Sequence, residues 1–302
     1  MKKKKRSRLP VMIALILILL LGIGLLAYPA VSDWYYSMNK AEILTEYQEG
    51  VKNLADAEKE AALEEARKYN ERLLTPIKYA DDLKELTEGY EDILNVNGRG
   101  LIGYVSIPVI KVNLPIYHGV SEAVLAVGAG HMNTSSFPIG GLGTHATISA
   151  HTGTAQQRLF SDLEMVELGD MFFITVLDEM LAYEVDDISV VLPADVSNLK
   201  IDKDKDQVTL VTCTPYGVNS HRLLVRGRRV EMPKEEAEEI IAEIEPTSTS
   251  NAWGLRYLIW TLIGIGIAVI FFAIFLVISR LLKHRKKAKK SKESPESPTG
   301  SD

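Results

Sequence analysis

Two long stretches without a charged residue interrupt an otherwise mixed chain, one near each end. Residues 9–31 and 258–278 contain no Asp, Glu, Lys or Arg. A helix rises about 1.5 Å per residue, so each stretch is long enough to cross a hydrocarbon core of roughly 30 Å. The pattern predicts transmembrane helices at residues 9–31 and 255–279. A cleaved signal peptide is the alternative for the first, but the apolar region exceeds the roughly 7–15 residues of such a peptide.

Basic residues cluster outside each apolar stretch. Lysine and arginine dominate residues 1–8 and 280–290, and cytoplasmic flanks of membrane helices are enriched in both. We therefore expect a protein that crosses the cell membrane twice, with both termini cytoplasmic and the middle segment extracellular. Residues 1–8 would form one basic tail. Residues 280–302 would form a second, which ends in a disordered Ser/Pro/Glu-rich stretch.

After the first apolar stretch, residues 32–97 are rich in Ala, Glu, Lys and Leu, with apolar positions close to a helical period. The segment is predicted to be α-helical. Its Glu-rich part, 57–68, lacks a wide apolar face, which favours a solvated stalk that lifts the next domain from the membrane. A partner-binding coiled coil is less favoured because no heptad pattern is sustained.

Residues 98–232 have a different texture, with short apolar runs separated by glycine and polar turns, at the spacing of an all-β barrel or sandwich. Helices are expected at 121–129, inside the irregular stretch 119–143, and at 155–166. The predicted strands are 101–107, 109–116, 145–150, 171–176, 180–188, 207–212 and 221–229. Residues 233–254 become acidic and then Pro/Ser/Thr-rich, which is typical of a linker.

Charge and cysteine content narrow the function. The formal net charge is −6 although both tails are basic, so the extracellular middle is acidic and nucleic acid is not an expected partner. The chain has one cysteine, Cys213, and therefore no internal disulfide. A free thiol in an exported domain is either a small buried hydrophobe or a reactive group.

Cys213 lies where a β-branched, apolar run ends. Pro215 and Gly217 break this run into a turn, and a second apolar run begins at His221. A loop of this length can fold Arg222 back beside Cys213. Along the second run side chains alternate, so Arg222 and His221 face opposite sides.

A thiol becomes a useful nucleophile when an imidazole or guanidinium lies close to it. Of the histidines, His151 is favoured, because it lies where the strand-like run 147–150 gives way to a loop, as Cys213 does. His145, at the start of the same run, is the main alternative. The β-rich segment contains His118, His131, His145, His151 and His221.

Metal and cofactor sites have weak support. One cysteine and no tight His/Asp/Glu cluster argue against zinc. Residues 202–206 (DKDKD) alternate acids but lack the glycine and terminal Glu of an EF-hand. Residues 140–143 (GGLG) are not followed by the Lys-Ser of a phosphate loop. We expect no metal and no cofactor.

Several motifs together resemble the pilus-assembling class C of the sortase family. Residues 209–217 (TLVTCTPYG) and 221–227 (HRLLVRG) are similar to the active-site segment of that class. Further similar motifs are residues 103–108 (GYVSIP), 114–119 (LPIYHG), 130–131 (GH), 136–141 (SFPIGG) and 149–153 (SAHTG). The likeness covers about 95–230. It implies a mainly β fold: a closed sortase-type β-barrel with short helices, preceded by the helical segment and flanked by the two membrane helices.

The resemblance also implies the chemistry. Cys213 would be the nucleophile, His151 the acid and base, and Arg222 the group that steadies the substrate carbonyl. The substrates would be pilins or surface proteins with LPXTG-like sorting signals, cleaved between Thr and Gly, and a pilin lysine amine would be the acceptor. Two alternatives stay open: a sortase that anchors surface proteins to peptidoglycan, and a non-catalytic surface binding domain with a buried Cys213.

One departure concerns a lid. Many class C members carry an Asp-Pro-aromatic motif before the barrel, in a lid that inserts beside the cysteine. Here residues 75–82 read TPIKYADD, without that triplet. Tyr79 and Asp81 are an aromatic and an acidic residue that could take the place of the motif, but a plain connection between helices is the simpler interpretation.

Overall fold

The computed structural model describes residues 42–75, 84–152 and 159–242, together with isolated positions within 17–28 and at 264 and 266. The predicted spans and both basic tails therefore fall almost entirely outside the described residues. Within the described part, no helix combines the length and apolar character that a membrane crossing requires.

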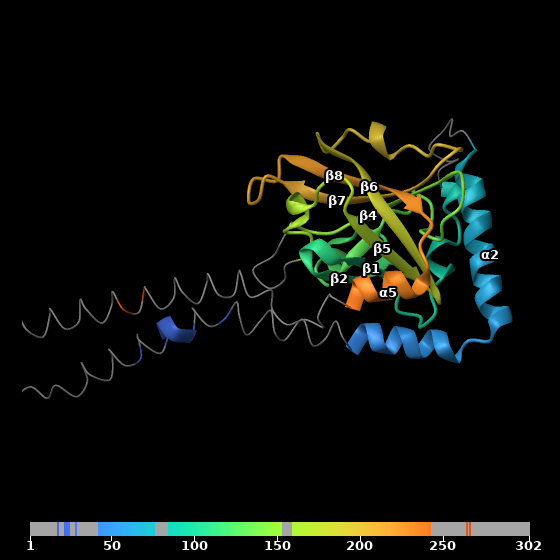
Figure 1. The fold of residues 1–302 in the computed structure, drawn as a ribbon, viewed down its shortest axis with the longest axis horizontal. Coiled ribbons are helices and arrows are strands. Elements are labelled where there is room, and N and C mark those ends of the chain that lie inside the picture. The colour runs from blue at the N-terminus through green and yellow to red at the C-terminus, as the bar shows by residue number, and fades with distance from the viewer. Residues whose placement is uncertain are drawn as a thin grey trace, which may run out of the picture. The chain divides into compact units, whose positions relative to one another are not determined.

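Within the described residues, eight strands close into one barrel in the order β1-β2-β3-β4-β7-β8-β6-β5 (Figure 1). Their bounds are β1 Leu101–Ile107, β2 Val112–His118, β3 Ala129–His131, β4 Thr144–Ser149, β5 Met171–Val176, β6 Glu179–Val191, β7 Asp206–Thr214 and β8 His221–Val230. The β2–β3 and β4–β7 pairs are parallel, and the remaining pairs are antiparallel. A mainly β, closed barrel is thus the observed fold.

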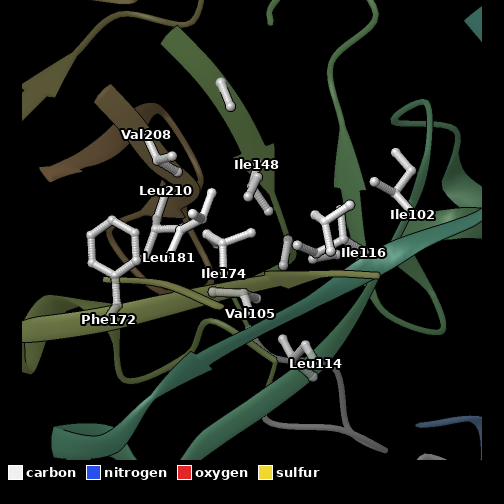
Figure 2. Close-up of a cluster of buried hydrophobic side chains, with 14 of the residues drawn as sticks. Ile102, Val105, Leu114, Ile116, Ile148, Phe172, Ile174, Leu181, Val208 and Leu210 are labelled. Atoms are coloured by element: carbon white, nitrogen blue, oxygen red, sulfur yellow. The ribbon is translucent and has the colours of Figure 1, made fainter. Parts of the chain in front are cut away.

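Apolar side chains from strands all around the barrel fill its interior, where they point toward one another (Figure 2). On β7, Val208 and Leu210 are buried in this core. Side chains alternate along a strand, so the intervening residues and Cys213 face outward. Burial of this interior determines which face of β7 carries the thiol.

Most of the predicted strands agree with the barrel. Two predicted segments differ, residues 109–116 and 121–129. Residues 109–116 were expected as one strand, but a short 3₁₀ helix, Pro108–Ile110, comes first. Lys111 then has a left-handed φ of 53°, which turns the chain before β2. In the expected helix 121–129, only Glu122–Leu125 (α4) is helical. The chain then enters β3, which pairs with β2 and β4.

Of the expected helix at 155–166, residues 153–158 lie outside the described part, and only Leu163–Met165 forms a 3₁₀ helix.

The helical segment before the barrel packs on it, which differs from the expected solvated stalk. One helix covers 42–53, and α2 spans Asp56–Leu73 along the side of the barrel (Figure 1). The buried face of α2 is narrow: Leu63, Ala66, Tyr69 and Asn70. These few residues suffice because Tyr69 is large and fully buried and Asn70 bonds to the barrel, so a wide apolar stripe is not needed.

The start of the expected linker is also ordered against the barrel. Lys234–Ala242 forms helix α5, whose Ala237 packs with Phe173 and Ala182. The apolar residues Ala237, Ile240 and Ile241 lie on one helical face at spacings of three and four, a pattern masked by the surrounding glutamates.

Candidate active site

Cys213 and Arg222 are direct partners in the antiparallel β7–β8 ladder. Directly opposed residues project to the same face of a sheet, so the thiol and the guanidinium both lie on the outer face of the barrel. Cys213 is partly exposed. The loop between the strands therefore folds Arg222 back beside the thiol, as expected from the sequence.

Arg222 differs from the other arginines of its strand. Arg226, Arg228 and Arg229 each pair with a carboxylate of Asp186, Glu184 or Asp206. Arg222 instead donates to the backbone carbonyl oxygens of Asn219 and His221, at 3.2 and 3.0 Å. Among the described residues, no carboxylate neutralises it. Its charge is available to an oxygen that becomes negative beside Cys213.

His151 follows β4, and its neighbours tie it to the thiol strand. The Ala150 amide donates to the Val211 carbonyl at 3.1 Å, and the Thr212 hydroxyl donates to the Ala150 carbonyl at 2.8 Å. On the other side, the Thr152 hydroxyl donates to the Cys213 carbonyl. His151 is thus held between two residues that are bonded to β7 around Cys213.

The other four histidines of the barrel lie in different environments. His145, the main alternative, is 1% exposed, and its ring nitrogens contact the Lys200 carbonyl at 2.9 Å and the Thr209 hydroxyl at 2.7 Å. Burial lowers the pKa of His145. Both nitrogens are occupied, so His145 has no free position for a reacting group.

His131 is fully buried, and desolvation lowers its pKa to about 4. Both ring nitrogens of buried His118 face backbone carbonyls, those of Gly100 and Ile93. His221 contacts the neighbouring Ser220 hydroxyl at 2.9 Å. Burial and these contacts indicate structural roles for His131 and His118.

Two residues at the site were not singled out from the sequence. Thr152 had a weak signal in the sequence, because its hydroxyl follows directly after a histidine at a strand end and can hydrogen bond to a neighbouring strand. Glu122 had none: its carboxylate oxygen Oε1 lies 3.2 Å from His151 Nε2 across a separation of 29 residues. The packing of α4 on β3 and the pairing of β3 with β4 bring the Glu122 and His151 side chains together.

The predicted absence of a metal stays a prediction. Across the described positions, no three His, Cys, Asp or Glu side chains form a group suited to an ion. The segment compared with a lid begins at Thr75, and its remaining residues, including Tyr79 and Asp81, lie outside the described residues.

A closed barrel that presents a thiol and a guanidinium on paired strands, with an imidazole just after the adjoining strand, is typical of a cysteine-dependent transpeptidase. The chain matches the sortase domain family model over residues 105–230. It belongs to the sortase family, a family of transpeptidases, and it is structurally close to class C sortases.

Three relatives illustrate the match. Sortase A of Streptococcus agalactiae serotype III (strain NEM316) is 36% identical over 118 residues, which are 38% of this chain and 47% of that protein. The chain thus spans about half the length of this curated relative. The Streptococcus pneumoniae sortase C structure is 42% identical with a TM-score of 0.57, covering 63% of this chain and 97% of that one.

The Clostridium perfringens sortase C structure, which carries the C-terminal cell wall sorting motif, is 40% identical with a TM-score of 0.56. The match covers 64% of this chain and all of that one.

Proposed function

We propose that this protein is a membrane-anchored cysteine transpeptidase that cleaves LPXTG-like sorting signals and joins pilin subunits through lysine isopeptide bonds. The observation that carries the proposal is the pairing of Cys213 with an Arg222 that has no carboxylate partner among the described residues, beside the tethered His151.

The first half of the reaction forms a thioester. The Cys213 thiolate attacks the carbonyl carbon of the signal's threonine, and the carbonyl oxygen becomes negative. Arg222 stabilises that oxygen with fixed positive charge. The carbon–nitrogen bond then breaks, and the imidazolium of His151 gives its proton to the departing glycine amine.

The second half regenerates the enzyme. A pilin lysine amine attacks the thioester carbonyl, and neutral His151 accepts the proton that the amine loses. The carbon–sulfur bond breaks, the thiolate is restored and an isopeptide bond remains. The proposed cycle needs no cofactor, because the proton that His151 gives to the leaving amine in the first half is replaced by the proton it accepts in the second half.

Exposed apolar side chains beside the thiol support a peptide substrate. Tyr216 and Val218 in the β7–β8 loop are 66% and 69% exposed. This loop joins the ends of the two strands at which Cys213 and Arg222 pair. Apolar surface of this kind suits an extended apolar peptide, and the C. perfringens relative was crystallised with its sorting motif.

The acceptor distinguishes pilus assembly from the alternative, attachment of surface proteins to peptidoglycan. A pilin acceptor is favoured by the class C neighbours, of which the pneumococcal structure was solved with attention to pilin substrate specificity. Both functions share the Cys213 thioester. They differ in whether a protein lysine or a cell-wall amine resolves it.

Two uncharged stretches with basic flanks support the two-pass membrane topology with an extracellular barrel. Protease added to intact cells should remove the barrel and spare both tails. Loss of either tail under those conditions would contradict this topology.

The function is tested with the full-length protein and a sorting-signal peptide. Mass spectrometry should detect an acyl adduct on the wild type and none on Cys213→Ala. A pilin that carries its signal should then give a ladder of covalent multimers, which disappears when its lysines are replaced. An adduct without a ladder, consumed instead by a cell-wall amine, would favour the peptidoglycan alternative.

A further inference from the structure

The Glu122 carboxylate contacts the His151 imidazole. Its Oε1 lies 3.2 Å from Nε2, and the His151 side chain is 26% exposed. A carboxylate has no proton to donate and only accepts hydrogen bonds. The contact therefore requires the hydrogen to be on Nε2.

Helix α4 fixes the backbone position of Glu122, whose side chain is 86% exposed. The Ser121 hydroxyl caps the helix by accepting from the Val124 amide, and Glu122 is the first helical residue. The helix packs over β3, where a side chain at Gly130 would press on Leu125 of the helix and collide with the backbone of Gly119, which precedes the helix. β3 in turn pairs with β4, so this close approach places Glu122 near the end of β4, where His151 lies.

We propose that Glu122 is a positioning residue that holds His151 as the Nε2–H tautomer, so that Nδ1 is the atom that transfers the proton. A neutral imidazole carries one hydrogen, so fixing it on Nε2 leaves the lone pair on Nδ1. In the described part of the chain, no group is hydrogen bonded to that nitrogen. This inference rests on the proposed function, in which His151 is the acid and base.

The cycle is consistent with this assignment. Imidazolium gives the Nδ1 proton to the leaving amine, while the Nε2 hydrogen remains bonded to Glu122. In the second half, Nδ1 accepts the proton of the incoming lysine amine. Glu122 thus acts through the ring and never contacts the substrate. His131 and His145 contrast with this arrangement, because both nitrogens of each ring are engaged within the fold.

Nitrogen NMR of histidine-labelled full-length protein tests the tautomer. The signals of His151 are assigned by their loss in His151→Asn. At a pH where the ring is neutral, the wild type should show a protonated Nε2 and an unprotonated Nδ1. Glu122→Gln should keep this tautomer, since an amide oxygen also accepts, whereas Glu122→Ala should give a mixture. A protonated Nδ1 in the wild type, or an unchanged tautomer in Glu122→Ala, would overturn the inference.

Steady-state kinetics add a second readout. Glu122→Ala should lower kcat about threefold to fivefold with KM unchanged, as expected for an exposed contact, and Glu122→Gln should restore most of the loss. The charge-matched control is Glu164→Ala, which removes an exposed glutamate from a different short helix and should not change kcat. Equal losses in the Ala and Gln variants would overturn the inference.

The two proposals fail separately. If the wild type forms no acyl adduct, the proposed function is wrong whatever the tautomer. If the adduct forms and the tautomer does not depend on Glu122, only the positioning role is wrong.

Discussion

The Thr152 hydroxyl donates a hydrogen bond to the backbone carbonyl of Cys213, which ties the loop after β4 to the strand that carries the thiol. Thr152 also contacts the Thr212 hydroxyl at 2.8 Å, and it is 7% exposed. Because His151 is the residue just before it, this bond ties the backbone next to the imidazole to the strand that carries the sulfur.

Thr152→Val keeps the shape of the side chain and removes the bond. We expect kcat for peptide cleavage to fall about tenfold, since the partly buried Cys213 carbonyl loses this donor and the His151 loop loses its tether. The matched control is Thr175→Val, which removes a buried hydroxyl that has no hydrogen-bond partner in the described region. Similar kcat values for the two variants would show that the tether is unimportant.

Arg222→Ala should lower kcat about 100-fold to 1000-fold, because the oxyanion loses its fixed positive charge. Arg222→Lys should recover part of this loss, since it keeps the charge but not the guanidinium geometry. Arg228→Ala on the same strand, where the side chain is 59% exposed and paired with Glu184, is the control and should change kcat less than twofold. If Arg222→Ala behaved like this control, Arg222 would have no role in the reaction.

Asn70→Ala tests the attachment of the helical segment. The Asn70 side chain accepts from the Phe137 amide at 2.7 Å and donates to the Phe137 carbonyl at 3.1 Å, and it is buried. Its loss leaves the Phe137 amide without this acceptor, while the Phe137 carbonyl keeps the hydrogen bond from the Ile139 amide at 2.9 Å. Urea unfolding should therefore show a loss of about 2 kcal/mol in unfolding free energy.

The neighbouring exposed residue provides the comparison for Asn70. Glu71→Ala should change the unfolding free energy by less than about 0.5 kcal/mol. An Asn70→Ala variant as stable as Glu71→Ala would mean that α2 contributes no stability through this contact.

His131 predicts a pH dependence of stability. Burial lowers its pKa in the folded protein to about 4, against about 6.5 in an unfolded chain. The neutral ring is favoured by folding, so its contribution is complete above about pH 6.5. It is lost as the pH falls toward 4, because only the unfolded chain binds the proton. A difference of this size corresponds to roughly 3 kcal/mol.

The measurement is the urea midpoint of the wild type and of His131→Phe across this pH range. Phenylalanine is chosen because His131 stacks on Phe137, with ring centroids 5.0 Å apart. The wild-type midpoint should fall more steeply between pH 6.5 and 4 than that of the variant. Parallel curves would mean that His131 does not cause the acid sensitivity.

Local patterns predicted the strands that have clear runs of apolar residues. β1 and β5 have the bounds expected from their apolar runs, and β7 and β8 extend only slightly beyond theirs. β3 was missed because three residues carry no periodic signal, and its stability comes from pairing with β2 and β4. The packing of α2 and α5 was missed because each buries only a narrow face.

The sequence by itself predicted which residues would carry the chemistry: a lone Cys213 at a strand end, an Arg222 that a short loop returns to it, and a His151 at another strand end. Turn residues and strand alternation act over a few positions, so these features can be interpreted locally. Only the tertiary structure decided which groups surround them. The Thr152 hydroxyl and the Glu122 carboxylate reach the site through pairings that join β3, β4 and β7. These contacts link residues 61 and 29 positions apart in the sequence, which is beyond the reach of local patterns.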